Sequence, residues 1–173
     1  IKDDLDTDGY LERVNQIMPD IIGFQVFSSD VFNVREALKK VKESYPDIIQ
    51  IVGGYHPSSV PEMAMMKHFT DADFGFQGEA EIGLPMFVQK VENKEDDWEA
   101  VPGLLWRKNG KIVANKPCFF DDLDEIGMPD WELINPLGYQ KTLQTIMVMA
   151  LPVAPIIATR GCPFHCTFCA GHK

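Results

Sequence analysis

The sequence predicts an α/β protein whose largely apolar strands form a parallel sheet covered by helices on both faces. Helical and strand patterns alternate through residues 1–95. The strand candidates are short apolar runs, as expected for strands buried on both faces. Each of the first two is followed by a loop and an amphipathic stretch, which indicates a doubly wound arrangement.

The first elements follow from apolar spacing and from breakers. Asp8 can cap a helix that carries Leu11, Val14 and Met18 on one face. Residues 21–27 predict the first strand and residues 48–52 the second. The helix between them has apolar positions at Val34, Ala37, Leu38, Val41 and Tyr45.

The second strand runs into Gly53-Gly54, and a further helix is expected soon after it. Ser59 and Glu62 have the spacing of a capping box, and Pro61 suits a first helical turn. Residues 72–76 predict a shorter strand. The next helix should present Leu84, Phe87, Val88 and Val91.

The pattern changes beyond residue 95. Two strand candidates, 104–108 and 111–114, flank Asn109-Gly110, which is a strong hairpin signal. Residues 117–136 are acidic and aperiodic, as in a linker, and 155–159 predict a buried strand. We therefore expect three parts: 1–95, the hairpin and linker 96–140, and the beginning of another domain at 141–173.

Composition narrows the possible partners. The formal net charge is −10 without a basic cluster, which argues against binding nucleic acid or an anionic membrane surface. The longest apolar run, 146–158, is shorter than the roughly 20 residues of a membrane span. No secretory signal is visible, so we expect a cytoplasmic protein. We also expect it to be part of a longer chain.

Three of the four cysteines lie close together. Cys162, Cys166 and Cys169 form a C-x-x-x-C-x-x-C pattern, and Gly161 and Pro163 can shape that loop. Three thiolates on one loop can ligate three irons of a 4Fe-4S cluster and leave the fourth iron open to a substrate group. Cys118 stands apart and is expected to be a small buried side chain.

The alternative for this loop is structural zinc, with His165 or His172 as a fourth ligand. Zinc sites usually join two half-sites about a dozen residues apart. This sequence offers a single CxxC, at Cys166 and Cys169, so the cluster is the favoured interpretation.

The cysteine loop resembles the signature of the radical S-adenosylmethionine superfamily, which follows the first strand of a partial (β/α) barrel. The resemblance implies that Phe168 lies near the adenosyl group and that the open iron chelates S-adenosylmethionine. It also implies reductive cleavage to a 5′-deoxyadenosyl radical, with a flavodoxin or ferredoxin as reductant. The substrate would be a small molecule or peptide that the sequence does not identify.

The front part resembles the Rossmann-like (flavodoxin-like) cobalamin-binding domain of one branch of that superfamily. The matching residues are Ser28, Gly53, Gly54, Gly78 and Glu79, in loops that follow predicted strands. Ligands of open α/β sheets bind at that edge. The alternatives are a simple turn at Gly53-Gly54 and helix caps at Ser28 and Ser59. The D-x-H-x-x-G motif, which supplies a histidine ligand to cobalt in some cobalamin proteins, is absent from this sequence. We therefore expect His56 to be a polar turn residue before Pro57 and not a cobalt ligand.

The resemblance as a whole implies a cobalamin-dependent radical enzyme. Methyl transfer to an unactivated centre is the most common reaction of such enzymes and is therefore the one expected here. Ring formation or rearrangement is an alternative, with a corrinoid domain that is vestigial. Two candidates from different functional classes are a non-catalytic corrinoid or nucleotide-binding module and a zinc-stabilised interaction protein.

Overall fold

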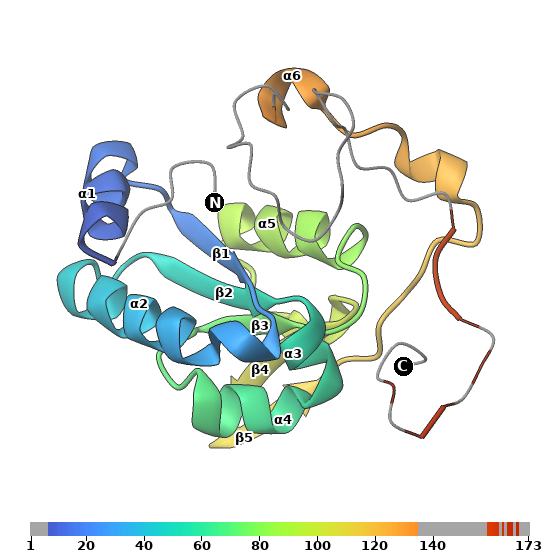
Figure 1. Ribbon diagram of the computed structural model, residues 1–173, viewed down its shortest axis with the longest axis horizontal. Helices are drawn as coiled ribbons and strands as arrows, with labels where there is room; N and C mark the ends of the chain where they lie inside the picture. Colours follow the sequence, from blue (N-terminus) through green and yellow to red (C-terminus); the bar gives the residue numbers. More distant parts are fainter. Residues whose placement is uncertain (1–6, 135–158, 163, 165, 168, 170–173) are drawn as a thin grey trace, which may run out of the picture.

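The computed structural model describes residues 7–134, 159–162, 164, 166–167 and 169 (Figure 1). Its centre is a five-stranded sheet in the order β1-β2-β3-β4-β5. The strands are β1 (Ile21–Gln25), β2 (Ile49–Gly53), β3 (Phe74–Phe76), β4 (Leu104–Lys108) and β5 (Lys111–Ala114). Each lies at the position of a strand candidate in the sequence, to within two residues at either end.

The sheet is mixed, which corrects the expectation of a parallel sheet. β1, β2 and β3 pair in parallel, whereas β4 pairs antiparallel with both β3 and β5. The hairpin therefore continues the sheet, through Gly75↔Leu105 and Phe76↔Leu104. Pairing with β4 also satisfies the backbone groups on the outer side of β3, which would otherwise form an exposed edge. Asn109 and Gly110 both have positive φ, 52° and 75°, as a two-residue hairpin turn requires.

Helices cover both faces of the sheet, as predicted. The helices that the structure describes are α1 (Thr7–Ile17), α2 (Val31–Ser44), α3 (Tyr55–Ser59), α4 (Pro61–Met63), α5 (Gly83–Asn93) and α6 (Trp131–Ile134). Short turns of other helix types are η1 (Ser28–Asp30), η2 (Ala64–His68), η3 (Trp98–Ala100) and η4 (Leu123–Ile126). In Figure 1, α5 lies on one side of the sheet and α2 and α4 on the other.

Alternating residues of β2 show how the two faces are filled. Val52 belongs to a core cluster with Leu38 of α2 and Met65 of η2. Its neighbour Ile51 belongs to a second cluster with Phe87 of α5. Because successive strand residues point to opposite faces, an almost continuous apolar run supplies both cores.

Several local expectations about the helices are wrong. Thr7 is already helical, so Asp8 lies inside the first turn of α1, where its carboxylate pairs with Lys40. Met18 follows the end of the helix at φ 46° and is exposed. Leu84 is also exposed on α5. Ser59 does not form a capping box, because its hydroxyl donates to the carbonyl of Tyr55.

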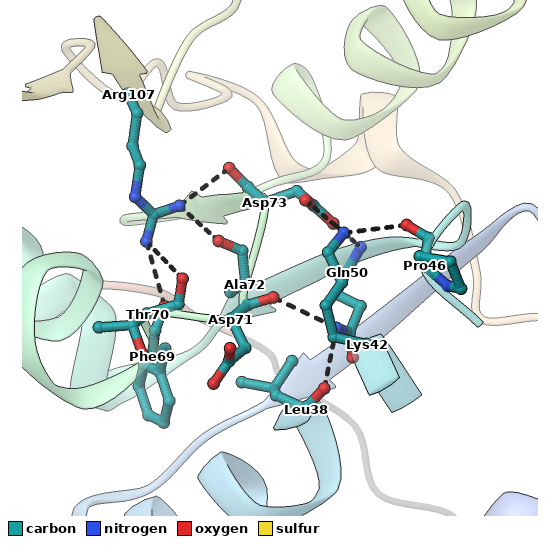
Figure 2. A network of polar contacts seen from close by, with 10 residues as sticks. All are labelled: Leu38, Lys42, Pro46, Gln50, Phe69, Thr70, Asp71, Ala72, Asp73 and Arg107. Atoms are coloured by element: carbon teal, nitrogen blue, oxygen red, sulfur yellow. Dashed lines mark hydrogen bonds and ion pairs between the residues drawn. The ribbon is translucent and has the colours of Figure 1, made fainter. Parts of the chain in front are cut away.

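The amino ends of the strands are joined by a polar network (Figure 2). The amide N–H of Gln50 donates to a carboxylate oxygen of Asp73 at 2.9 Å, and Lys42 donates to the other at 2.8 Å. The Gln50 side chain is fully buried and donates to the carbonyls of Leu38 and Asp71. These contacts connect α2, β2 and the start of β3 at the edge opposite to the predicted site.

Arg107 on β4 extends this network to the helical segment that precedes β3 (Figure 2). Its guanidinium donates to backbone carbonyls of Met65, Phe69, Thr70, Ala72 and Asp73. The helical segment ends at His68, so the carbonyls around that end lack helical partners and accept hydrogen bonds from the guanidinium instead. Burial lowers the pKa of Arg107, opposed by the nearby carboxylates of Asp73 and Asp71.

The helices that the structure describes include none with the length and apolar character needed to cross a membrane.

Candidate cofactor-binding site

Three predicted loops meet at one edge of the sheet, which we call the carboxyl edge. β1, β2 and β3 run in parallel, so the loops after Gln25, Gly53 and Phe76 leave the sheet on the same side. This edge is where open α/β sheets bind ligands. The structure therefore brings together the segments that contain Ser28, Gly53-Gly54 and Gly78-Glu79.

A chain of side chains links the first two loops. The Ser28 hydroxyl Oγ lies 2.9 Å from Nδ1 of His56, and His56 Nε2 lies 2.8 Å from Nδ1 of His68. His56 is buried, with 8% of its surface exposed. Burial, and then the charge of His68, lower its pKa. His56 is thus a buried linking residue and not the simple turn residue that the sequence suggested.

The hydroxyl of Ser28 is not a helix cap. Phe27 occupies the N-cap position of η1, and no side chain caps that turn. Ser28 itself is exposed at the carboxyl edge, while its hydroxyl contacts His56. The cap interpretation of Ser28 and Ser59 is therefore wrong, and Ser28 is left facing the edge where a ligand would bind.

Gly53 and Gly54 are adjacent, but glycine is present at the two positions for different structural reasons. Gly54 has φ +92°, and a Cβ there would lie 3.1 Å from the Val26 amide nitrogen. The backbone crossing between the two loops thus requires glycine at this position. At Gly53 a Cβ would meet only Phe76, at an ordinary 3.8 Å. The fold therefore tolerates a side chain at Gly53, and close approach of a ligand remains as a reason for glycine.

The second and third loops are joined through Ser58. Its hydroxyl donates to the carbonyl of Gly54 at 2.8 Å and accepts from the amide of Gly78 at 2.9 Å. Gly78 has φ +73°, and a Cβ there would lie 2.9 Å from the Pro117 side chain. The positive φ of the turn and the close packing of Pro117 therefore explain why residue 78 is glycine.

Glu79 takes part in an ion pair with the cysteine segment. The guanidinium of Arg160 lies 3.0 Å from Glu79 Oε2 and 2.7 Å from Glu81 Oε1. Arg160 stands two positions before Cys162. The approach to the cysteine loop therefore contacts the loop that follows β3.

Exposed aromatic rings lie next to the glycine loop. Phe27 and Tyr55 stack with centroids 5.4 Å apart and an interplanar angle of 26°. Their exposed fractions are 46% and 65%. They follow β1 and β2 respectively, so an apolar surface accompanies Ser28 and Gly53 at the carboxyl edge.

The cysteine loop is described only in part. Cys162, Cys166 and Cys169 are exposed, and the amide of Cys169 donates to the carbonyl of Cys166 at 3.1 Å. Within the described residues, no three His, Cys, Asp or Glu side chains are arranged to hold a metal ion. The three-thiol donor set nevertheless suits a cluster by its chemistry. Cluster ligation stays a prediction.

The remaining predictions about this region have mixed outcomes. Cys118 is exposed, which contradicts its expected burial. Phe168, His165 and His172 lie outside the described residues, as does most of the strand expected at 155–159. The contact of Phe168 with S-adenosylmethionine therefore stays a prediction.

A hollow of about 440 Å³ lies away from this site, at the amino edge of the sheet. Its lining includes Asp73, Trp98, Trp106, Arg107 and Lys108. The predicted cofactor residues are not part of that lining. We assign it no role, since Asp73 and Arg107 belong to the structural network of Figure 2 and Lys108 pairs with Glu99.

Sequence reasoning missed His68, Ser58 and Arg160. Each contacts a predicted residue or its loop across a gap in the sequence, and none belongs to the motifs that drew attention to the others. Arg160 offered one signal, because it is a cation beside a cysteine loop and the Gly78 loop carries two carboxylates.

Comparison with known proteins identifies the front part. The model of the B12 binding domain matches residues 2–88. An uncharacterized methyltransferase of Pyrococcus horikoshii is 25% identical over 171 residues, which cover 98% of this chain and 35% of that protein. The anaerobic magnesium-protoporphyrin IX monomethyl ester cyclase of Rubrivivax gelatinosus is 31% identical over 176 residues, covering 98% and 30%.

Solved structures agree on the fold. The cobalamin-dependent S-adenosylmethionine radical enzyme OxsB, with aqua-cobalamin bound, superimposes with a TM-score of 0.61 at 21% identity. The match covers 74% of this chain and 18% of that one. The chain spans about a third of the length of the two curated relatives named above. It belongs to the B12-binding domain family, in the form carried by cobalamin-dependent radical S-adenosylmethionine enzymes.

Proposed function

We propose that this chain binds cobalamin at its carboxyl edge and a 4Fe-4S cluster on its cysteine loop, as part of a radical S-adenosylmethionine enzyme. The observation that carries the proposal is the contact chain along that edge. Ser28–His56 joins the first two loops, Ser58–Gly78 joins the next two, and Arg160 connects the cysteine segment to the third.

The residues at the edge fit a large planar ligand. Gly53 leaves room for a close approach, and Phe27 with Tyr55 offers exposed aromatic surface. Ser28 can contribute a hydroxyl that His56 orients. His56 itself is buried and hydrogen-bonded on both ring nitrogens, so we assign it to positioning and not to cobalt ligation.

The cysteine loop fits the cluster by its donors. Cys162, Cys166 and Cys169 would ligate three irons and leave the fourth for S-adenosylmethionine, with Phe168 beside the adenosyl group. When bound, the cluster supplies one electron for cleavage of S-adenosylmethionine and cobalamin supplies a methyl carrier. The chain's own residues hold these groups near each other and limit their access to water.

Methyl transfer is the reaction class we favour. The similarity to an uncharacterized methyltransferase over nearly the whole chain supports it. The similarity to a cyclase supports the second candidate, a ring-forming reaction. The substrate, a small molecule or peptide, and a flavodoxin-like or ferredoxin-like reductant would be recognised in either case. Reduced thiols suit a cytoplasmic setting.

Anaerobic reconstitution with iron and sulfide tests the cluster. We expect about four irons per chain and a reduced paramagnetic signal that S-adenosylmethionine alters. One tightly bound zinc without that signal would favour the structural alternative instead.

Retention of hydroxocobalamin through gel filtration tests the corrinoid site. We expect near-equimolar retention, and Gly53→Ala should weaken it. Reconstitution of the cluster without any cobalamin retention would instead indicate a vestigial corrinoid domain.

A further inference from the structure

The side chain of Arg160 connects two segments that lie far apart in the sequence. One nitrogen of its guanidinium faces Glu79 at 3.0 Å and the other faces Glu81 at 2.7 Å. Both carboxylates lie in the loop between β3 and α5, and Arg160 is followed by Gly161 and Cys162. The planar guanidinium suits this geometry because its donors are fixed in a fork.

Partial burial makes this contact stronger than an ordinary surface ion pair. The exposed fractions of the side chains are 26% for Arg160, 25% for Glu79 and 33% for Glu81. Charges shielded from water in this way are screened less by salt than fully exposed ones. Burial tends to raise the pKa of Glu81, yet the hydrogen bond and charge of Arg160 lower it overall.

The same ion pair shifts the pKa of Arg160 in the opposite direction from the pKa of Glu81. The hydrogen bond to Glu81, supported by Glu79, raises the pKa of Arg160. Arg160 and Glu81 therefore favour each other's charged forms, and Glu79 adds a second carboxylate contact to the same guanidinium. Glu79, which the sequence assigned to cobalamin, directs its carboxylate to this cation.

The ion pair between Arg160 and the two carboxylates affects the geometry of the carboxyl edge, because the Glu79 loop is connected to the other loops there. The Glu79 loop is tied to the glycine loop through Ser58 and Gly78, and the glycine loop is tied to Ser28 through His56. Anchoring Arg160 at Glu79 and Glu81 therefore sets where the cysteine loop begins relative to the carboxyl edge.

We propose that Arg160, Glu79 and Glu81 form a latch that holds the cysteine loop against the carboxyl edge. Arg160 is then a positioning residue, because it acts on the cluster through the loop that carries the cysteines. The value of this arrangement for catalysis rests on the proposed function, whereas the latch itself does not require either cofactor to be bound.

Trypsin gives a direct test, because it cleaves after arginine and needs that side chain to enter its own pocket. The bond between Arg160 and Gly161 should be protected while the latch is closed. The variant Glu79→Gln/Glu81→Gln keeps side-chain size and removes both charges. We expect its initial cleavage rate at this bond to rise about tenfold, since cleavage follows the population of the open form.

Glu99→Gln is the matched control, because Glu99 pairs with Lys108 on β4 and not with the cysteine segment. It should leave the cleavage rate at Arg160 unchanged. The bond after Arg107 reports the integrity of the fold and should stay resistant in every variant. If the double variant exposes that bond too, the single variants Glu79→Gln and Glu81→Gln decide, each with a smaller increase expected.

The consequence for the cluster is measured on reconstituted protein. Glu79→Gln/Glu81→Gln should begin with the wild-type iron content, because the cysteines are intact, and should release iron to a chelator several times faster than Glu99→Gln. Equal trypsin cleavage in the Glu79/Glu81 variants and in wild type would overturn the latch. Such a result would leave cobalamin and cluster binding unaffected, so it is distinguishable from failure of the proposed function.

Discussion

The hydroxyl oxygen of Ser28 lies 2.9 Å from Nδ1 of His56, which joins the loop after β1 to the loop after β2. A neutral His56 with its hydrogen on Nε2 satisfies both of its contacts. In that tautomer Nδ1 would accept from Ser28, and Nε2–H would donate to Nδ1 of His68, which lies 2.8 Å away. The buried imidazole thereby fixes the position of a hydroxyl at the edge where the ligand is expected.

This arrangement predicts a pH dependence of stability. Burial and the charge of His68 lower the pKa of His56 below its ordinary value of 6.5. The unfolded chain then takes up a proton before the folded chain does. Stability is fully present above pH 6.5 and is lost as the pH falls toward the folded pKa. His56→Gln should show a shallower fall in the free energy of unfolding as the pH drops below 6.5, measured by urea unfolding, and parallel slopes would contradict this assignment.

The two glycines should respond differently to alanine. Gly54→Ala places a Cβ 3.1 Å from the backbone of Val26 at positive φ, so it should cost about 1–3 kcal/mol of unfolding free energy. Gly53→Ala should stay within about 1 kcal/mol of wild type. Urea unfolding measures both.

A ligand assay completes the glycine comparison. If Gly53 lies beside cobalamin, Gly53→Ala should weaken hydroxocobalamin binding about tenfold while the protein stays folded. An unchanged affinity in this variant would remove Gly53 from the site.

Arg107 should contribute more to stability than its neighbour Lys108. The guanidinium serves several backbone carbonyls at the end of a helical segment, including Met65 at 2.9 Å and Phe69 at 3.3 Å. Arg107→Met leaves those carbonyls without a charged donor and should cost about 2–3 kcal/mol. Lys108→Met removes an exposed ion pair with Glu99 and should have little effect. Equal losses in chemical denaturation would be inconsistent with the network of Figure 2.

Each cysteine of the loop should be essential for the intact cluster. Cys162→Ala, Cys166→Ala and Cys169→Ala should all lose it, as measured by iron content and by the reduced paramagnetic signal. Cys118→Ala is the matched control, since Cys118 is also an exposed thiol but lies outside the loop. Wild-type iron content in any loop variant would exclude that cysteine as a ligand.

The strands could be read from the sequence because local signals determine them. Apolar runs bounded by breakers gave β1 and β2, and Asn109-Gly110 gave the hairpin to the residue. The sequence could not tell that this hairpin pairs with β3, since no local pattern encodes which free edge a hairpin joins. For that reason the sheet is mixed where a parallel one was expected.

The site was predictable as a set of loops but not as a set of contacts. Glycines and a serine after successive strands indicated the carboxyl edge, because parallel strands end on the same side. His68 and Arg160 reach that edge through side-chain contacts with residues distant in the sequence. The Ser59 capping box failed for a related reason. Val60 leaves the helical conformation at φ −138°, so α3 and α4 are separate helices and the box cannot form.

The most direct test of the proposed function is magnetic, because it asks whether both cofactors lie at one edge. The chain is loaded with cob(II)alamin and a reconstituted cluster, and the spin relaxation of the cobalt signal is measured with the cluster oxidised and then reduced. We predict faster cobalt relaxation when the cluster becomes paramagnetic, and a weaker effect in Glu79→Gln/Glu81→Gln. Full occupancy of both sites with unchanged cobalt relaxation would contradict a shared edge.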